Sequence, residues 1–328
     1  MDDPFKSVAD SQYTPPFFLR NGHAQTIYPA IARRVRDVSY RRERINTPDN
    51  DFLDLDWAIT SRPAQRLVIL CHGLEGHSNR SYVRGMARAV NAAGWDALAW
   101  NYRGCSGEPN RQLRFYHNGA TDDLNVVVAH AAQQRKYQRI ALIGFSLGGN
   151  LVLNYLTWHR AALPPTLCGA VVFSVPLHIP SSAAALAQPA NRIYMKRFLK
   201  DLKVKITAKE FQFPGAISSD GYDQITDFEG FDDRYTAPLH GFADAMDYWQ
   251  KCSGLNVLSD IRHPTLIVNA QNDPFLSPEC FPVDMLARND TVHLLTPRHG
   301  GHCGFPQFGC GGLYWSEEVA CRFMDAAF

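Results

Sequence analysis

One serine of this chain stands between glycines in a position that could make it a nucleophile. Ser146 lies in LIGFSLGGN (142–150), after the apolar run RIALIGF and before LGGNLVLNYLTWH. These flanks predict a buried strand followed by a helix. A serine between them sits on a sharp, strained turn, where neighbours without Cβ relieve crowding. The bare G-x-S-x-G pattern also occurs in ordinary glycine-rich junctions, so its chemistry depends on residues elsewhere in the chain.

A serine hydroxyl attacks a carbonyl when a histidine accepts its proton and a carboxylate holds the imidazole. The histidines beyond the segment 176–235 are His240, His263, His293, His299 and His302. His263 precedes a predicted strand and His293 lies inside one, which favours structural roles for both. The loop PRHGGHCGF follows the last predicted strand. Small residues around His302 favour it as the base, with His299 as the alternative.

The acid is expected at the end of another strand. Asp273 follows the strand in LIVNAQNDPFL, at the edge of the sheet where Ser146 is expected. A turn aspartate before Pro274 is the alternative for this residue, and Asp284 and Asp290 lie further from a strand end. The order Ser146, Asp273, His302 is the order of nucleophile, acid and base in α/β hydrolases.

Two backbone N–H groups are needed to stabilise the negative oxygen that forms on the carbonyl. One comes from the residue after the nucleophile, here Leu147, and the other from the loop after an early strand. That loop is CHGLEGHSN (71–79), in which we expect Leu74 to be the second donor. We expect His72 to shape the loop, because the order of the three residues above already supplies a base.

Strands and helices alternate through most of the chain. Predicted strands lie in 66–73, 95–104, 139–146, 168–176, 264–271 and 291–297, with predicted helices in 81–94, 121–134, 147–159 and 314–326. This alternation predicts a mostly parallel sheet covered on both faces. Before it, two alternating stretches around TPDND predict an antiparallel hairpin. The expected class is α/β, with an α/β-hydrolase fold and a helical cap insertion.

We expect a single domain over residues 1–328, with an N-terminal arm (1–33) lying on its surface. The segment 176–235 breaks the alternation and is expected to be a cap above the carboxyl edge of the sheet. Within it, SSAAALAQPANRIYMKRFLKDLKVKI predicts helix and DGYDQITDFEGFDDRYTA an acidic, aromatic loop. PLHGFADAMDYWQKC is then expected to return as a helix packed on the sheet. Aromatic residues in the arm and the cap suggest an apolar acyl pocket.

Composition excludes several classes of function. The 33 basic and 32 acidic residues give a formal charge of +1, so no nucleic-acid partner is expected. No apolar run is long enough to cross a bilayer, and MDDPFKSVAD is not a secretory signal. The eight cysteines are scattered without a C-x-x-C pair. We therefore expect reduced thiols, a cytoplasmic location, and no metal or other cofactor.

Eight motifs together resemble the YheT-like branch of the α/β-hydrolase superfamily, from about residue 17 to the C-terminus. They are NGHAQTIYP, PDNDFLDLDW, CHGLEGHSNRSYVRGMA, AWNYRGCSGEPNR, RFYHNGATDDL, GFSLGGN, NAQNDPFL and HGGHCGF. The resemblance implies a carboxylesterase-like enzyme, with eukaryotic relatives that act on phospholipids and other lipid esters. It maps the family's catalytic residues onto Ser146, Asp273 and His302.

The stretch HNGATD also fits an H-x-x-x-x-D pattern associated with acyltransferases. A plainer interpretation is that Asp122 or Thr121 caps the helix that begins there.

A second loop, NYRGCSGEPN, is expected to be a structured loop near the site. In it we expect Arg103 to pair with Glu108. Cys105 is a candidate reactive thiol, but nothing in the sequence indicates a lowered pKa for it.

The resulting hypothesis is a serine hydrolase that cleaves short- to medium-chain or lipid esters through an acyl-enzyme. An acyltransferase or amidase using the same residues is an alternative, as is a non-catalytic binding protein. A small-molecule ester or lipid is the expected partner. Contact with a membrane surface is left open, as is the oligomeric state.

Overall fold

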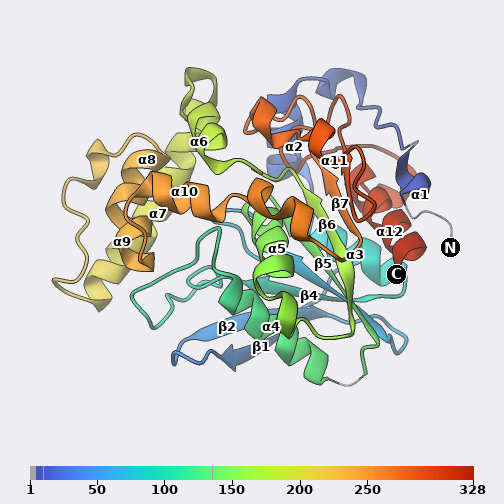
Figure 1. Ribbon diagram of the computed structural model, residues 1–328, viewed down its shortest axis with the longest axis horizontal. Coiled ribbons are helices and arrows are strands. Elements are labelled where there is room, and N and C mark those ends of the chain that lie inside the picture. The colour runs from blue at the N-terminus through green and yellow to red at the C-terminus, as the bar shows by residue number, and fades with distance from the viewer. Residues whose placement is uncertain (1–4, 10, 135) are drawn as a thin grey trace.

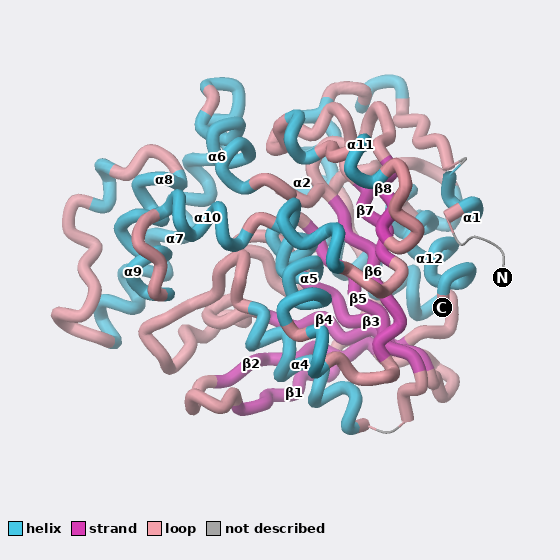
Figure 2. Tube along the Cα trace, viewed as in Figure 1, coloured by secondary structure: helices cyan, strands magenta, loops and turns pink. Residues whose placement is uncertain are grey.

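The computed structural model describes residues 5–9, 11–134 and 136–328. Within these ranges, eight strands form one sheet in the order β1-β2-β4-β3-β5-β6-β7-β8 (Figures 1 and 2). The strands are β1 (Arg41–Asn46), β2 (Phe52–Ala58), β3 (Arg66–Cys71), β4 (Asp96–Asn101), β5 (Arg139–Phe145), β6 (Leu167–Phe173), β7 (Thr265–Val268) and β8 (Val292–Leu295). β2 pairs antiparallel with β1 and β4, and all other pairs are parallel. The predicted sheet with its N-terminal hairpin is confirmed.

Helices lie on both faces of this sheet (Figure 1). They are α1 (Lys6–Ala9), α2 (Gly22–Ala32), α3 (Ser81–Ala92), α4 (Thr121–Gln133), α5 (Leu147–Trp158), α6 (Ile179–Ala187), α7 (Arg192–Gln212), α8 (Phe228–Phe231), α9 (Ala237–His240), α10 (Ala245–Cys252), α11 (Val283–Leu286) and α12 (Trp315–Ala327). Strand β3 shows why both faces are covered. Its Leu67 and Ile69 belong to the same core cluster as residues of α4 and α5, whereas Val68 and Leu70 pack with residues of α3 and α12. Alternate side chains of one buried strand thus serve two apolar layers.

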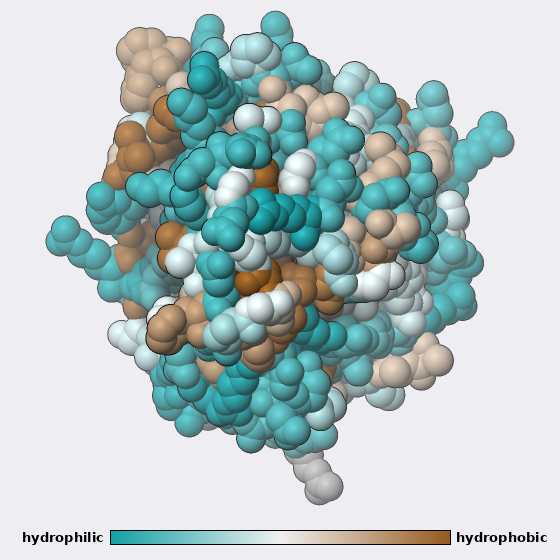
Figure 3. All heavy atoms as spheres, turned by 90° about the vertical axis from the view of Figure 1, so that its left-hand side faces the viewer, coloured by the Kyte–Doolittle hydropathy of each residue, from teal (hydrophilic) through white to brown (hydrophobic). Residues whose placement is uncertain are grey.

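The cap is formed by helices α6 to α10, which lie at one side of the sheet (Figure 1). The stretch 220–237, predicted as a loop, contains α8 and a π-helical turn, η5 (Asp232–Thr236). Helix α10 was predicted to pack on the sheet, but Tyr248 and Trp249 instead pack with Ile179 and Ala183 of α6. The apolar side of α10 is therefore covered by another helix of the cap, α6, and not by the sheet. The outer face of this side is mostly hydrophilic, with hydrophobic residues gathered near its middle (Figure 3).

Part of the N-terminal arm is helical, which the sequence pattern did not predict. Asn21 caps α2 by accepting hydrogen bonds from the amides of His23 (2.9 Å) and Ala24 (3.3 Å). The helix lies against α3 and the loop that follows β8. Residues 1–4 and 10 of the arm lie outside the described ranges.

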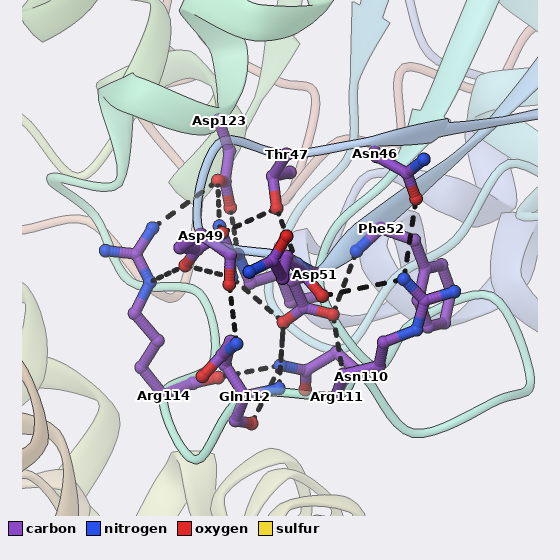
Figure 4. A network of polar contacts seen from close by, with 12 residues as sticks. Asn46, Thr47, Asp49, Asp51, Phe52, Asn110, Arg111, Gln112, Arg114 and Asp123 are labelled. Atoms are coloured by element: carbon purple, nitrogen blue, oxygen red, sulfur yellow. Dashed lines mark hydrogen bonds and ion pairs between the residues drawn. The ribbon is translucent and has the colours of Figure 1, made fainter.

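A buried arginine joins three segments that are distant in sequence. The Arg103 side chain is 1% exposed and forms ion pairs with Asp49 (2.8 Å), Asp51 (2.9 Å) and Asp123 (2.7 Å). Figure 4 shows these carboxylates converging from the β1–β2 turn and from α4. The network fixes the hairpin and the loop after β4 against α4.

The predicted pairing of Arg103 with Glu108 is wrong. Glu108 is exposed and pairs with Arg44 of β1 at 2.7 Å. Three aspartates brought close by the fold saturate the guanidinium of Arg103, so Glu108 turns outward to the hairpin.

The seven cysteines whose side chains are described are free thiols, as predicted. At Cys105, burial raises the thiol pKa to about 11, so that side chain is not a reactive thiolate. Of the described helices, none is both long and apolar enough to cross a membrane.

Candidate active site

Ser146 occupies a strained turn between β5 and α5. Its φ and ψ are 54° and −122°, backbone angles that residues other than glycine rarely adopt. The surrounding backbone holds it there: its amide donates to the Phe173 carbonyl (2.8 Å), and its carbonyl accepts from the amides of Gly149 (2.9 Å) and Asn150 (3.1 Å). This turn holds Ser146 at the carboxyl end of β5.

Two glycines beside the serine are required by close approach of the backbone. A Cβ on Gly148 would lie 2.4 Å from the Cys71 carbonyl oxygen, and one on Gly144 would lie 2.5 Å from the Gly148 oxygen. Across the site, a Cβ on Gly73 would lie 3.2 Å from the Cβ of Ser146. The glycines therefore let strand β5, helix α5 and the loop after β3 meet at the serine.

The structure brings Asp273 and His302 together, as the sequence order suggested. His302 Nδ1 donates to Asp273 Oδ2 at 2.9 Å and lies 3.1 Å from Oδ1. Asp273 Oδ1 also accepts from the Phe275 amide (2.9 Å), and the Phe275 ring stacks near the imidazole with centroids 4.1 Å apart. Because Nδ1 is engaged, the other ring nitrogen, Nε2, is the one available for proton transfer.

The charge around His302 favours its protonated form. Burial alone would lower the imidazole pKa, but Asp273 and the neighbouring Cys303 side chain raise it to about 10. The carboxylate thus holds the ring in place and stabilises the imidazolium that forms when His302 accepts a proton.

Helix α2 supports the histidine loop, a contribution that the sequence pattern did not reveal. The Thr26 hydroxyl accepts the His302 amide hydrogen (2.9 Å), and Gln25 Oε1 accepts from the Gly300 amide (2.9 Å) and from Asn272 Nδ2 (2.9 Å). In the sequence, helix α2 is signalled by Asn21, a residue type favoured at the N-cap, which directly precedes Gly22.

The competing histidines lie elsewhere. His299 Nδ1 lies 3.4 Å from Asn272 Nδ2, one residue before the acid, and it lines neither cavity at the serine. His72 is buried and accepts from the Tyr102 amide at Nε2 (3.3 Å), with Nδ1 on the Gly73 carbonyl (2.8 Å). Burial lowers the pKa of His72 to about 3, which fits the structural role expected for it. Asp284 lies in α11, away from His302.

The H-x-x-x-x-D residues do not form a unit, and the capping interpretation is wrong. Helix α4 has Ala120 at its N-cap with no side-chain capping bond. Asp122 lies 3.6 Å from His159, whereas Thr121 bonds His159 at 3.0 Å. His117 packs on His240, with ring centroids 4.3 Å apart. Tertiary contacts with α5 replace the local cap.

The loop after β3 carries Leu74 and is clamped from both sides. Glu75 has φ of 50°; its amide donates to the Tyr116 oxygen (2.7 Å), and the Tyr116 hydroxyl donates to Glu75 Oε1 (2.7 Å). Lys205 of cap helix α7 pairs with the same carboxylate oxygen. The Gly73 amide donates to the Tyr82 hydroxyl (3.0 Å). This clamp fixes the backbone around the Leu74 N–H.

A family model described as the alpha/beta hydrolase fold matches residues 66–306 of the chain. The chain belongs to the alpha/beta hydrolase family. This α/β hydrolase is 34% identical to YheT of Escherichia coli strain K12 over 302 residues, covering 90% of this chain and 88% of that protein. It is 28% identical to phospholipase ABHD3 of Mus musculus over 329 residues, covering 98% of this chain and 78% of that protein. It is 27% identical to a monoacylglycerol lipase of Saccharomyces cerevisiae over 361 residues, covering 93% of this chain and 78% of that protein.

Solved structures agree on the fold of this α/β hydrolase. The Pyrococcus furiosus esterase Pf2001 superposes with a TM-score of 0.58 at 18% identity, covering 90% of this chain and 98% of that one. At this identity the likeness concerns the fold alone.

Two cavities of this α/β hydrolase meet at Ser146. The first, the cap cavity, has a volume of about 110 Å³. Its lining includes Leu74, Ser146, Leu147, Ile179, Leu186, Phe228 and Asp232. The second, the arm cavity, has a volume of about 310 Å³ and lies between α2, the loop after β3 and α7. Its lining includes Ile31, Gly73, Leu74, Ser146, Ile193, Arg197 and His302. A molecule bound beside Ser146 can therefore extend in two directions.

Proposed function

We propose that this chain is a serine hydrolase that cleaves carboxylic esters, with Ser146 as nucleophile, His302 as base and Asp273 as its partner. The observation that supports this most directly is the bond from His302 Nδ1 to Asp273 beside a cavity that His302 shares with Ser146. It leaves Nε2 on the side from which a serine proton can be taken. The strained backbone of Ser146 supports the same role.

In this mechanism the Ser146 hydroxyl oxygen bonds to the ester carbonyl carbon while His302 Nε2 takes the hydroxyl proton. The Leu74 and Leu147 N–H groups receive the negative charge on the carbonyl oxygen, aided by the N-terminus of α5. The ester C–O bond then breaks, and His302 gives its proton to the departing alcohol. Water attacks the acyl-enzyme by the same route in reverse, releasing the acid and restoring Ser146.

The two cavities suggest where each half of the ester lies. His302 lines the arm cavity and does not line the cap cavity, whereas Leu147 lines the cap cavity. Since His302 must protonate the leaving alcohol, the alcohol occupies the arm cavity. The acyl group then occupies the cap cavity, whose side chains are mainly apolar.

A short- to medium-chain or lipid ester fits this division. The cap cavity is lined mainly by apolar side chains, as small-molecule sites generally are. Relatives named as a phospholipase and as a monoacylglycerol lipase support a lipid ester as the substrate class.

Exposed apolar residues support contact with a lipid surface at the mouth of the arm cavity. Ile31 and Ile193 line that cavity and are 65% and 66% exposed. Nearby in the arm, Phe18 is 56% exposed and stacks on Phe308, with ring centroids 5.8 Å apart. Flotation with phosphatidylcholine vesicles tests this. Binding that survives Ile31→Asp and Ile193→Asp together would contradict it.

Labelling with a fluorophosphonate probe followed by peptide mass analysis tests the nucleophile. We expect the label on Ser146, its loss in Ser146→Ala, and its retention in the control Ser182→Ala, whose serine also lines the cap cavity. Hydrolysis of p-nitrophenyl esters of increasing chain length should fall by roughly 10⁶-fold in Ser146→Ala. A label at another residue, or unchanged hydrolysis in Ser146→Ala, would overturn the proposal.

The same assay separates the alternatives. Faster release from p-nitroanilides than from matched esters would indicate an amidase. Transfer of the acyl group to added alcohol in preference to water would indicate an acyltransferase. A binding protein on this fold would show neither labelling nor turnover.

A further inference from the structure

A partly buried carboxyl group, that of Asp232, lines the otherwise mainly apolar cap cavity. Asp232 begins the π-helical turn η5, between α8 and α9. Its Oδ1 accepts from the Thr236 hydroxyl (2.5 Å) and its Oδ2 accepts from Trp249 Nε1 (2.7 Å). Both donors are neutral. Such π-helical turns are rare and frequently occur at functional sites.

No cation offsets this carboxyl group. Within the described part of the chain, Asp232 forms no ion pair with a lysine, arginine or histidine, and the charged side chain that acts on its pKa, Asp233, raises it further. Burial therefore raises the pKa of Asp232 to about 7. A carboxylate offers about four acceptor positions, of which these bonds use two. The group retains capacity for a hydrogen bond from a molecule in the cavity.

Two donors line the same cavity. His117 Nδ1 accepts from the Gly119 amide (3.1 Å), which places the proton of its neutral ring on Nε2. The Tyr248 oxygen accepts from both the amide and Nδ2 of Asn118 (3.0 and 2.9 Å), which leaves its own proton to donate. The two rings lie 5.7 Å apart. The cavity therefore holds both an acceptor and donors.

This polar group lies away from the nucleophile. Helix α5, which Ser146 immediately precedes in sequence, lies near the centre of Figure 1, whereas α8 and α9, on either side of η5 in sequence, lie on its left-hand side. Apolar side chains such as Ile179, Leu186 and Phe228 also line the cavity. A chain bound there passes apolar walls and meets a polar patch.

We propose that Asp232 is a specificity-determining residue that binds a hydroxyl group on the acyl chain, at a carbon remote from the ester. A hydroxyl both donates and accepts, so it matches the carboxyl group together with its neighbouring donors. An unsubstituted chain of the same length would cover Asp232 without giving it a partner. The inference rests on the proposed function, in which the acyl group occupies the cap cavity.

The test compares p-nitrophenyl esters of ω-hydroxy acids from C6 to C12 with their unsubstituted counterparts. For at least one length we expect wild type to favour the hydroxylated ester by about 10-fold or more in kcat/KM, the usual effect of a hydrogen bond to a charged group. Asp232→Leu should reverse this preference. Asp232→Asn, which keeps acceptor and donor atoms for Trp249 and Thr236, should retain part of it. The control Asp233→Asn, altered outside the cavity, should leave it unchanged.

Hydrolysis of p-nitrophenyl acetate, too short to reach Asp232, separates this inference from the proposed function. If acetate is not hydrolysed and Ser146 is not labelled, the proposed function fails. If acetate hydrolysis persists in Asp232→Leu or Asp232→Asn but the ratio between paired esters equals that of wild type, the role of Asp232 is overturned. A wild-type preference for the unsubstituted ester at every length also overturns it.

Discussion

The ammonium group of Lys205 lies 2.9 Å from the carboxylate of Glu75, and their side chains are only 7% and 11% exposed. Lys205 belongs to cap helix α7, and Glu75 directly follows Leu74 in the loop proposed to hold the oxyanion. The cap therefore contributes to the position of a backbone N–H group at the site. Glu75 needs this support because its φ of 50° is unfavourable for a residue with a side chain.

Replacing Lys205 by methionine should lower kcat by about 10- to 100-fold and change KM by less than about threefold, because a displaced oxyanion donor acts mainly on the transition state. Lys205→Arg should retain most of the activity. Steady-state hydrolysis of p-nitrophenyl butyrate, measured well below each variant's Tm, checks this. The control is Lys203→Met. Lys203 lies in the same helix as Lys205, and its replacement removes only an exposed ion pair with Asp223.

The double variant Lys205→Met, Glu75→Gln separates positioning from stability. Removing both charges should recover much of the stability lost when one buried partner is removed, about 3–5 kcal/mol. It should not recover kcat. Equal kcat values for Lys205→Met and Lys203→Met would contradict the positioning role.

The raised pKa of His302 predicts the pH dependence of the reaction. His302 must be neutral to accept the serine proton, so kcat/KM should rise with pH through an inflection well above the ordinary value of 6.5, towards about 10. Asp273→Asn should move the inflection to lower pH and reduce kcat by roughly 10⁴-fold. A pH–rate profile between pH 5 and 11 measures both effects, and an inflection unmoved in Asp273→Asn would contradict the pairing.

The same shift has a consequence for stability, with a definite sign. A folded-state pKa above the unfolded one means that protonated His302 stabilises the fold. That contribution is complete below pH 6.5 and is lost as the pH rises through about 10.

Gly148 should tolerate no side chain. The Cβ of Gly148→Ala would lie 2.4 Å from the Cys71 oxygen and 2.5 Å from the His72 oxygen, so α5 would have to move away from the loop after β3. We expect a loss of at least about 3 kcal/mol in urea unfolding, or no folded protein. Gly230→Ala is the matched control, because the nearest atoms to its Cβ lie at 3.6 Å. Similar stabilities for the two variants would refute this packing.

Arg103→Met should destabilise the protein by about 3–5 kcal/mol, because it removes the buried cation shared by three aspartates. Asp49 and Asp123 then keep only their longer pairs with Arg114 (3.4 and 3.5 Å). Glu108→Gln, which breaks the exposed pair with Arg44, should cost less than about 1 kcal/mol. Urea unfolding at pH 7 compares the two. Equal losses would show that Arg103 is not the anchor of the network.

Acid should weaken this network. Burial would raise the pKa of Asp49, but its bonds to Arg103 and Thr47 lower it to about 2. The stabilisation from Asp49 is therefore present above the ordinary carboxyl pKa of 3.8 and is lost as the pH falls through about 2. In Arg103→Met this loss should begin at higher pH, which an acid titration followed by circular dichroism would detect.

The parallel strands could be predicted because each is a short apolar run with its own turn signals, as in Leu67–Leu70 between Arg66 and Gly73. The hairpin of β1 and β2 could be predicted from alternating residues around a turn. The site could be proposed because nucleophile, acid and base follow strand ends at one edge. The partners of Arg103 could not be predicted, because Glu108 is close to it in sequence whereas the aspartates that pair with it are distant in sequence and come close only in the folded chain. The role of Thr26 was also hidden, because its contact with His302 spans 276 positions.

That contact also sets the order in which the site can be completed during synthesis. Ser146 and its glycines leave the ribosome long before the loop of His302, and that loop needs helix α2 from the beginning of the chain as its support. The nascent chain therefore carries Ser146 before the proposed base, His302, is in place. In the proposed mechanism, full nucleophilic reactivity arises only when the first and last parts of the domain have met.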